Sequence, residues 1–144
     1  MIVLDTNVIS AMIRQPVDEP VKRWLNNQER IQLWTTSVTV YELEFGIRRL
    51  AAGKRQDELD QQISDLIRGR LRSQILILDI AAAKAAGLLA AQLSNAGKTI
   101  EARDAMIAGI VIANGASFAT RNIRHFQYTG IPLVNPWDHG TTSE

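Results

Sequence analysis

Short apolar runs alternate with longer amphipathic segments along the chain. The runs are three to seven residues long and most are rich in isoleucine, valine and leucine, whereas the segments repeat apolar residues at intervals of three and four. The first pattern predicts buried strands and the second predicts helices with one apolar side. Strands are therefore predicted at residues 2–4, 31–37, 75–79, 117–120 and 132–135. Helices are predicted at residues 6–14, 18–28, 39–52, 55–73, 81–93 and 102–115.

Strands that are apolar throughout and alternate with helices are typical of a parallel sheet with helices on both faces. The predicted fold class is therefore α/β. In such sheets ligands bind beyond the carboxyl ends of the strands. The longest apolar stretch, "AMIAGIVIA" at residues 105–113, is too short to span a membrane, and Asp5 interrupts the N-terminal apolar run. We expect a cytoplasmic protein that does not enter a membrane.

The amino-acid composition limits the kinds of site that this chain can form. The 144 residues suit one domain, no cysteine is present for a disulfide or a thiolate metal site, and two histidines disfavour a zinc site. The net charge of +1 does not indicate nucleic-acid binding by itself. Basic residues do cluster at 48–55 and 68–72, where they either form solvated helix faces or contact an acidic partner or RNA.

Polar residues follow several predicted strands. Asp5 ends the first strand, Glu42 lies on the helix after the second, and Asp104 opens the helix before the fourth. Because the carboxyl ends of parallel strands meet at one edge of a sheet, these side chains are expected to converge. Asn122 follows the fourth strand, so the candidate site residues from this pattern are Asp5, Glu42, Asp104 and Asn122.

Each of these residues also has a purely structural interpretation. Asp5 could cap a helix, and Glu42 could complete a capping box with Thr39. Asp104 could interact with a helix N-terminus, and Asn122 could stabilise a turn. Three carboxylates in one site, however, would repel one another unless a cation joined them. Mg²⁺ prefers oxygen ligands, so the pattern favours metal-dependent phosphodiester chemistry.

Four segments, in this order, resemble the PIN-domain ribonucleases, and most of all the VapC-type toxins of bacterial toxin–antitoxin pairs, including the FitB-like branch. They are "IVLDTNVIS", "TVYELEFG", "EARDAMIAGIVIANGASFATRN" and "HFQYTGIPLVNPW". The resemblance extends from Ile2 to Trp137. It implies a PIN-like three-layer fold with a central parallel sheet, a single PIN domain at residues 1–137 and a polar C-terminal tail at residues 138–144.

The resemblance also implies roles for the candidate residues. Asp5, Glu42 and Asp104 match the family's acidic ligands for Mg²⁺ or Mn²⁺. Thr6, Asn7 and Thr120 match polar residues that line the family's site. Asn122 stands at a fourth position that is often aspartate, so it can supply a neutral oxygen but no charge, and one firmly held metal ion is expected.

Partners follow from the same resemblance. It implies an endoribonuclease acting on RNA, a cognate VapB-type antitoxin, a homodimer within the toxin–antitoxin complex, and contact with operator DNA only through the antitoxin. The alanine-rich segment 80–93 could pack against a second copy or in the core.

Two alternatives stay open. Asn122 is compatible with a catalytically impaired PIN-fold module that binds RNA or a partner protein. A phosphotransfer enzyme is the second alternative, but it requires a second aspartate at position 7 or a lysine at position 121, where Asn7 and Arg121 stand.

Overall fold

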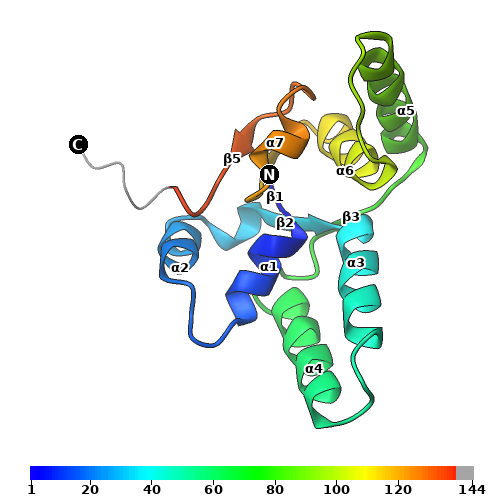
Figure 1. Cartoon of the computed structure of the whole chain (residues 1–144). Helices are drawn as coiled ribbons and strands as arrows, with labels where there is room; N and C mark the ends of the chain where they lie inside the picture. The colour runs from blue at the N-terminus through cyan, green and yellow to red at the C-terminus, as the bar shows by residue number, and fades with distance from the viewer. Residues whose placement is uncertain (139–144) are drawn as a thin grey trace.

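The computed structural model describes residues 1–138 and forms a five-stranded, all-parallel sheet (Figure 1). The strand order is β3-β2-β1-β4-β5. The strands are β1 (Ile2–Leu4), β2 (Leu33–Thr36), β3 (Ile75–Leu76), β4 (Ser117–Ala119) and β5 (Leu133–Val134). The helices are α1 (Thr6–Ile13), α2 (Glu19–Asn26), η1 (Arg30–Gln32, a 3₁₀ turn), α3 (Ser37–Arg48), α4 (Lys54–Arg68), α5 (Ile80–Asn95), α6 (Ala102–Ala113) and α7 (Ile123–Phe126).

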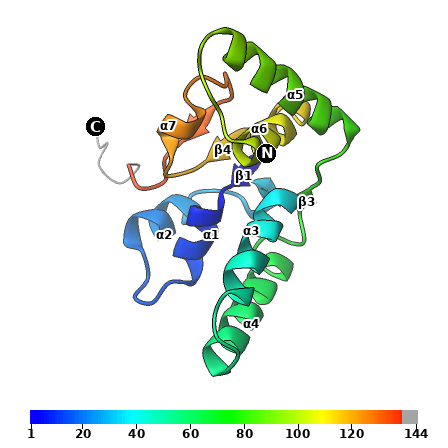
Figure 2. The same cartoon turned by 45° about the vertical axis from the view of Figure 1, so that its right-hand side comes forward.

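Two hydrophobic cores lie on opposite faces of the sheet. Helices α5, α6 and α7 cover one face, where Val3 and Phe118 pack against Ile107. Helices α1 to α4 cover the other face, where Leu4 packs with Ile9 and other apolar residues of these helices. In both views the two groups of helices lie on opposite sides of the sheet (Figure 2). The predicted three-layer α/β fold with a central parallel sheet is confirmed.

The order of the strands creates a crevice at the carboxyl edge of the sheet. From β1 the chain proceeds to β2 and β3 on one side, and it then crosses back to β4 and β5 on the other side of β1. Loops that leave β1 and β4 therefore diverge, which is the arrangement that opens a ligand site in parallel sheets. Because Leu4 pairs with Ala119, the residues that follow them, Asp5 and Thr120, face each other across this crevice.

Several elements are shorter than the sequence pattern predicts. The predicted strand 31–37 begins only at Leu33, because the preceding residues form η1. The predicted helix 55–73 ends at Arg68. Arg72 and Ser73 adopt left-handed backbone conformations (φ of 54° and 57°), and a helix cannot continue through them.

Helix α6 is held against α5 by very close packing at Gly109. A Cβ atom at this position would lie 2.4 Å from the carbonyl oxygen of Ala82 and 2.7 Å from Cβ of Ala86. Ala82, Ala86, Leu89 and Leu93 of α5 are buried, so this face of the alanine-rich segment serves the core. This packing fixes α6, whose first turn carries Asp104.

No helix in the described part of the chain is long and apolar enough to span a membrane. Most of the predicted polar tail, residues 139–144, lies outside the described residues.

Candidate active site

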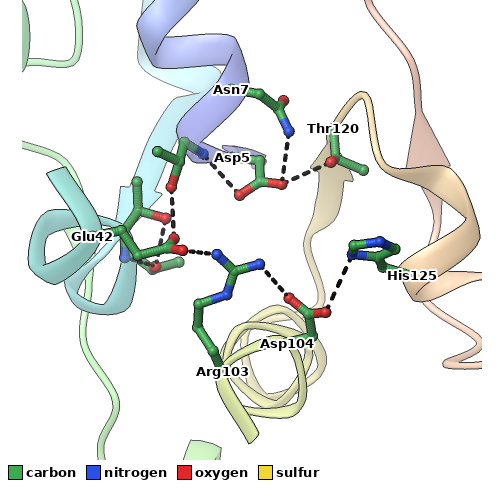
Figure 3. Close-up of polar contacts among 10 residues, drawn as sticks. Asp5, Asn7, Glu42, Arg103, Asp104, Thr120 and His125 are labelled. Carbon is green, nitrogen blue, oxygen red and sulfur yellow. Dashed lines mark hydrogen bonds and ion pairs between the residues drawn. The ribbon is translucent and has the colours of Figure 1, made fainter. Parts of the chain in front are cut away.

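Asp5 is the buried centre of the polar cluster at the end of β1. Its Oδ1 accepts a hydrogen bond of 2.8 Å from the backbone N–H of Thr6, and through this contact the side chain caps α1. Its Oδ2 accepts hydrogen bonds from Thr120 Oγ1 (2.7 Å) and Asn7 Nδ2 (3.3 Å) (Figure 3). The capping interpretation is therefore correct for Asp5, but it accounts for only one of the two carboxylate oxygens.

Burial raises the pKa of the Asp5 carboxyl above its ordinary value, and the nearby Asp104 carboxylate acts in the same direction. Hydrogen bonds from Thr120 and Thr6 and the charge of Arg103 oppose this increase in pKa without cancelling it. Asp5 is only 3% exposed, so water contributes little to solvating its charge. The fold therefore keeps an acid in a place where its ionised form is costly.

Thr120 and Asn7 hold the two loops of the crevice together. Thr120 Oγ1 accepts a hydrogen bond from the backbone N–H of Asn122 (3.0 Å) while it donates to Asp5. Asn7 Oδ1 accepts from the backbone N–H of Arg121 (3.2 Å). Asn122 is exposed, and the contact that ties it to the site is made by its backbone. The structure thus brings Asn122 beside the site, and the role of its side chain stays a prediction.

Glu42 enters the site from the second turn of α3. Its Oε1 accepts a hydrogen bond of 2.6 Å from Thr6 Oγ1. The proposed capping box with Thr39 is wrong, because the helix begins two residues earlier and Thr36 caps it by accepting from the Thr39 N–H (3.0 Å). Glu42 is therefore not needed at the helix start, and its carboxylate, 11% exposed, points toward the other acids.

Asp104 lies in the first turn of α6 and is also buried. Its Oδ1 accepts a hydrogen bond of 2.8 Å from Nη2 of Arg103, and its Oδ2 lies 3.5 Å from Nδ1 of His125 on α7. Buried carboxylates require a charged or hydrogen-bonding partner, and Asp104 has one on each side.

Arg103 stands at the centre of the cluster, and the sequence analysis did not identify it. Its guanidinium lies between the carboxylates of Glu42 and Asp104, with Nη1 paired to Glu42 and Nη2 to Asp104 (Figure 3). One feature of the sequence did point to Arg103. It lies in the first turn of a predicted helix, where a positive charge interacts unfavourably with the helix dipole, so another contact must stabilise it. His125 was likewise considered only as a zinc ligand and not as a neighbour of Asp104.

The charges in the site do not balance. Asp5, Glu42 and Asp104 bring three carboxylates, and Arg103 brings one positive charge. As arranged, no three acidic or histidine side chains in the described residues are grouped to hold a metal ion. The donor set nevertheless fits a hard divalent cation, since all the carboxylate ligands are oxygens and their total charge exceeds that of one arginine.

Two open clefts adjoin the acidic cluster. One, of about 520 Å³, begins at Thr6 and Glu42 and runs between α1, α3 and α4 toward Arg55. The other, of about 580 Å³, is bordered by Asp104 and His125 and by the basic side chains of Lys98 and Arg124. Glu42 therefore borders one open cleft and Asp104 borders the other.

The basic clusters have local partners. Arg48 pairs with Glu44 (3.0 Å) and with Asp60, and Arg68 pairs with Asp65 (3.0 Å), all at the surface. These contacts favour the interpretation as solvated helix faces for Arg48 and Arg68.

The sequence and the fold of this chain are similar to those of known proteins. The model of the family described as "PIN domain" matches residues 2–131. The chain is 35% identical to the VapC ribonuclease Y4jK of Sinorhizobium fredii over 96% of this chain and 99% of that protein. It is 31% identical to the toxin FitB of Neisseria gonorrhoeae over 95% of this chain and 99% of that protein.

A solved structure gives the same result for the fold. The crystal structure of FitAcB from Neisseria gonorrhoeae superimposes with a TM-score of 0.88 at 30% sequence identity, and the match covers 96% of this chain and 99% of that one. The family model, the relatives and the solved structure therefore agree on the family of this chain. The chain belongs to the PIN-domain family, among the VapC and FitB toxins.

Proposed function

We propose that this protein is the toxin of a toxin–antitoxin pair and that it cleaves RNA with the help of Mg²⁺ or Mn²⁺. The observation that carries the proposal is the convergence of Asp5, Glu42 and Asp104 from three separate elements at one edge of the sheet. Asp5 and Asp104 are buried and Glu42 is partly buried, which costs stability, so a function is needed to explain these three acids. The name of one relative, a VapC ribonuclease, supports nuclease activity in this chain, and the name of another, the toxin FitB, supports its role as a toxin.

Asp5 and Asp104 would hold the metal ion, and Glu42 would complete its coordination directly or through a water. A bound divalent ion supplies positive charge for the scissile phosphate and lowers the pKa of a water. Thr120 and Asn7 fix the orientation of the Asp5 carboxylate, and Thr6 fixes that of Glu42. Glu42 is the least buried of the three acids, and in this proposal it would accept a proton from the attacking water.

RNA would reach the acids through the adjoining clefts. Lys98 and Arg124 border the cleft beside Asp104 and can neutralise backbone phosphates. The RNA in this proposal is single-stranded or looped at the cleavage site. Its bases are then unpaired and can enter an open cleft without first separating from a complementary strand. Arg121 lies over the ring of Trp137 (4.6 Å) and provides a further positive charge near Thr120.

The partners in this proposal are a VapB-type antitoxin and a second copy of the chain. The cleft between α1, α3 and α4 leads to Thr6 and Glu42, so an antitoxin segment lying in it would end at the acidic cluster. Exposed apolar side chains of α3 and α5, among them Tyr41, Phe45, Ile80 and Leu88, are candidates for the dimer contact. DNA contact is assigned to the antitoxin and not to this chain.

The experiment that tests the proposal is incubation of purified, antitoxin-free protein with total cellular RNA in Mg²⁺, in Mn²⁺ and in chelator. Discrete fragments are expected with either metal, none with chelator, and none after addition of the cognate antitoxin. Asp5→Asn is the matched control, because it keeps the size and the cap of the side chain and removes the charge. Absence of cleavage by folded protein in both metals would favour the impaired binding module.

A further inference from the structure

The guanidinium of Arg103 occupies the position between Glu42 and Asp104 at which a shared cation would neutralise both carboxylates (Figure 3). The guanidinium of arginine is planar and carries N–H donors on all three nitrogens, so Nη1 and Nη2 can pair with two different acids. Arg103 thereby supplies the positive charge that three converging carboxylates require when no ion is bound.

We propose that Arg103 is an internal competitor of the divalent cation, which holds the acidic site together without metal and leaves it when metal binds. This inference rests on the proposed function, because it assumes that Asp104 and Glu42 are metal ligands. Two positive charges cannot share the space between these carboxylates without strong repulsion. Metal binding and the Arg103 bridge therefore exclude each other.

The surroundings of Arg103 allow the side chain to leave. It is 38% exposed, in contrast to Asp104 at 4%. Its Nε is buried and has no hydrogen-bond partner within the described residues, so the bridged position leaves one donor unsatisfied. Arg103 also borders an open cleft with Tyr41 and Met106, and the side chain can extend into this space.

Competition has a measurable consequence for metal affinity. If the bridge occupies the site in about nine molecules of ten, the apparent dissociation constant for metal is about tenfold larger than the intrinsic one. Removing the bridge should restore the intrinsic affinity. It should also destabilise the metal-free protein, because Glu42 and Asp104 would lose their shared partner.

The test is calorimetric titration of the full chain with Mn²⁺, comparing the wild type with Arg103→Gln and Arg48→Gln. Arg48 is the matched control, because it also bridges two carboxylates, those of Glu44 and Asp60, but at the surface on α3 and α4. Arg103→Gln should bind Mn²⁺ about tenfold more tightly than wild type, and Arg48→Gln should bind as wild type does.

Thermal melting gives a second readout that does not depend on activity. In chelator, Arg103→Gln should melt below the wild type, and Mn²⁺ should raise its melting temperature more than that of the wild type. Arg103→Lys keeps the positive charge but loses the planar guanidinium, so its Mn²⁺ affinity should lie between those of wild type and Arg103→Gln. If Arg103→Gln does not fold in chelator, the Mn²⁺ affinity of Arg103→Lys relative to wild type tests the inference instead.

Two results would overturn the inference in distinguishable ways. Equal or weaker Mn²⁺ binding by Arg103→Gln, with clear binding by the wild type, would contradict competition and leave the proposed function standing. No Mn²⁺ binding by either protein would contradict the metal site itself and, with it, the role of Arg103.

Discussion

The Oγ1 hydroxyl of Thr120 donates a hydrogen bond of 2.7 Å to the Asp5 carboxylate, although 115 residues separate them in the chain. The contact follows from the register of the sheet, in which Leu4 of β1 pairs with Ala119 of β4. The residues after these paired positions must then face each other. The central acid of the site is thus positioned by backbone pairing, and its hydrogen bonds orient it.

Removal of either buried aspartate should abolish cleavage without unfolding the protein. Asp5→Asn and Asp104→Asn keep the side-chain shape but remove a charged metal ligand, so RNA cleavage should fall by at least about 100-fold. Initial rates on a defined RNA, with circular dichroism to check folding, measure the effect. Wild-type rates in either variant would refute the assignment of that aspartate.

The stability of the metal-free protein should depend on the charge of Asp5. Because its pKa is raised above the ordinary value of 3.8, protonation favours the folded state, and this stabilisation is lost as the pH rises through the pKa of the folded protein. Asp5→Asn carries no such charge. In chelator its melting temperature should match that of wild type near pH 4 and exceed it by about 2–4 °C at pH 7. A difference in melting temperature between Asp5→Asn and wild type that does not change with pH would contradict this prediction.

Asn122→Asp should tighten metal binding without inactivating the protein. The residue lies beside Thr120 and is exposed, so a new carboxylate there adds negative charge near the site at little cost in burial. An increase in Mn²⁺ affinity of about two- to tenfold is expected by calorimetry, since the charge of nearby ligands tunes the binding of divalent ions. An unchanged Mn²⁺ affinity would show that the Asn122 side chain does not belong to the metal site.

Gly109→Ala should destabilise the fold because its Cβ would collide with the Ala82 carbonyl of α5. A loss of about 1–3 kcal/mol in the free energy of unfolding is expected from urea denaturation. Gly87→Ala is the matched control on α5, where nothing lies within 4 Å of the added Cβ. It should be neutral or stabilise the helix by up to about 1 kcal/mol. Equal effects of the two substitutions would show that the contact of α5 with α6 is looser than described.

The fold class could be predicted from the sequence because it follows from local patterns, in which apolar runs mark the five strands. Asp5 and Asp104 stand at strand or helix ends that a parallel sheet brings together, whereas Thr120 was expected only from the family resemblance. The position of Glu42 was less clear, because Thr36 and Thr39 are both good helix caps and only the structure distinguishes them.

Arg103 could not be predicted in the same way. Its role depends on α6 bringing it beside Glu42 of α3, and α6 is positioned by tertiary packing, including its close contact with α5 at Gly109. The same holds for His125, which reaches Asp104 from a separate short helix. Local patterns predict where polar residues end an element, but they do not predict which side chain fills the space between them.

The most direct test of the account is an anomalous difference map from crystals of the protein soaked in Mn²⁺. The account predicts one strong peak within ligand distance of the Asp5 and Asp104 carboxylates, with the Arg103 side chain withdrawn from between Glu42 and Asp104. A map without a peak at the acids, and with Arg103 still bridging Glu42 and Asp104, would contradict it.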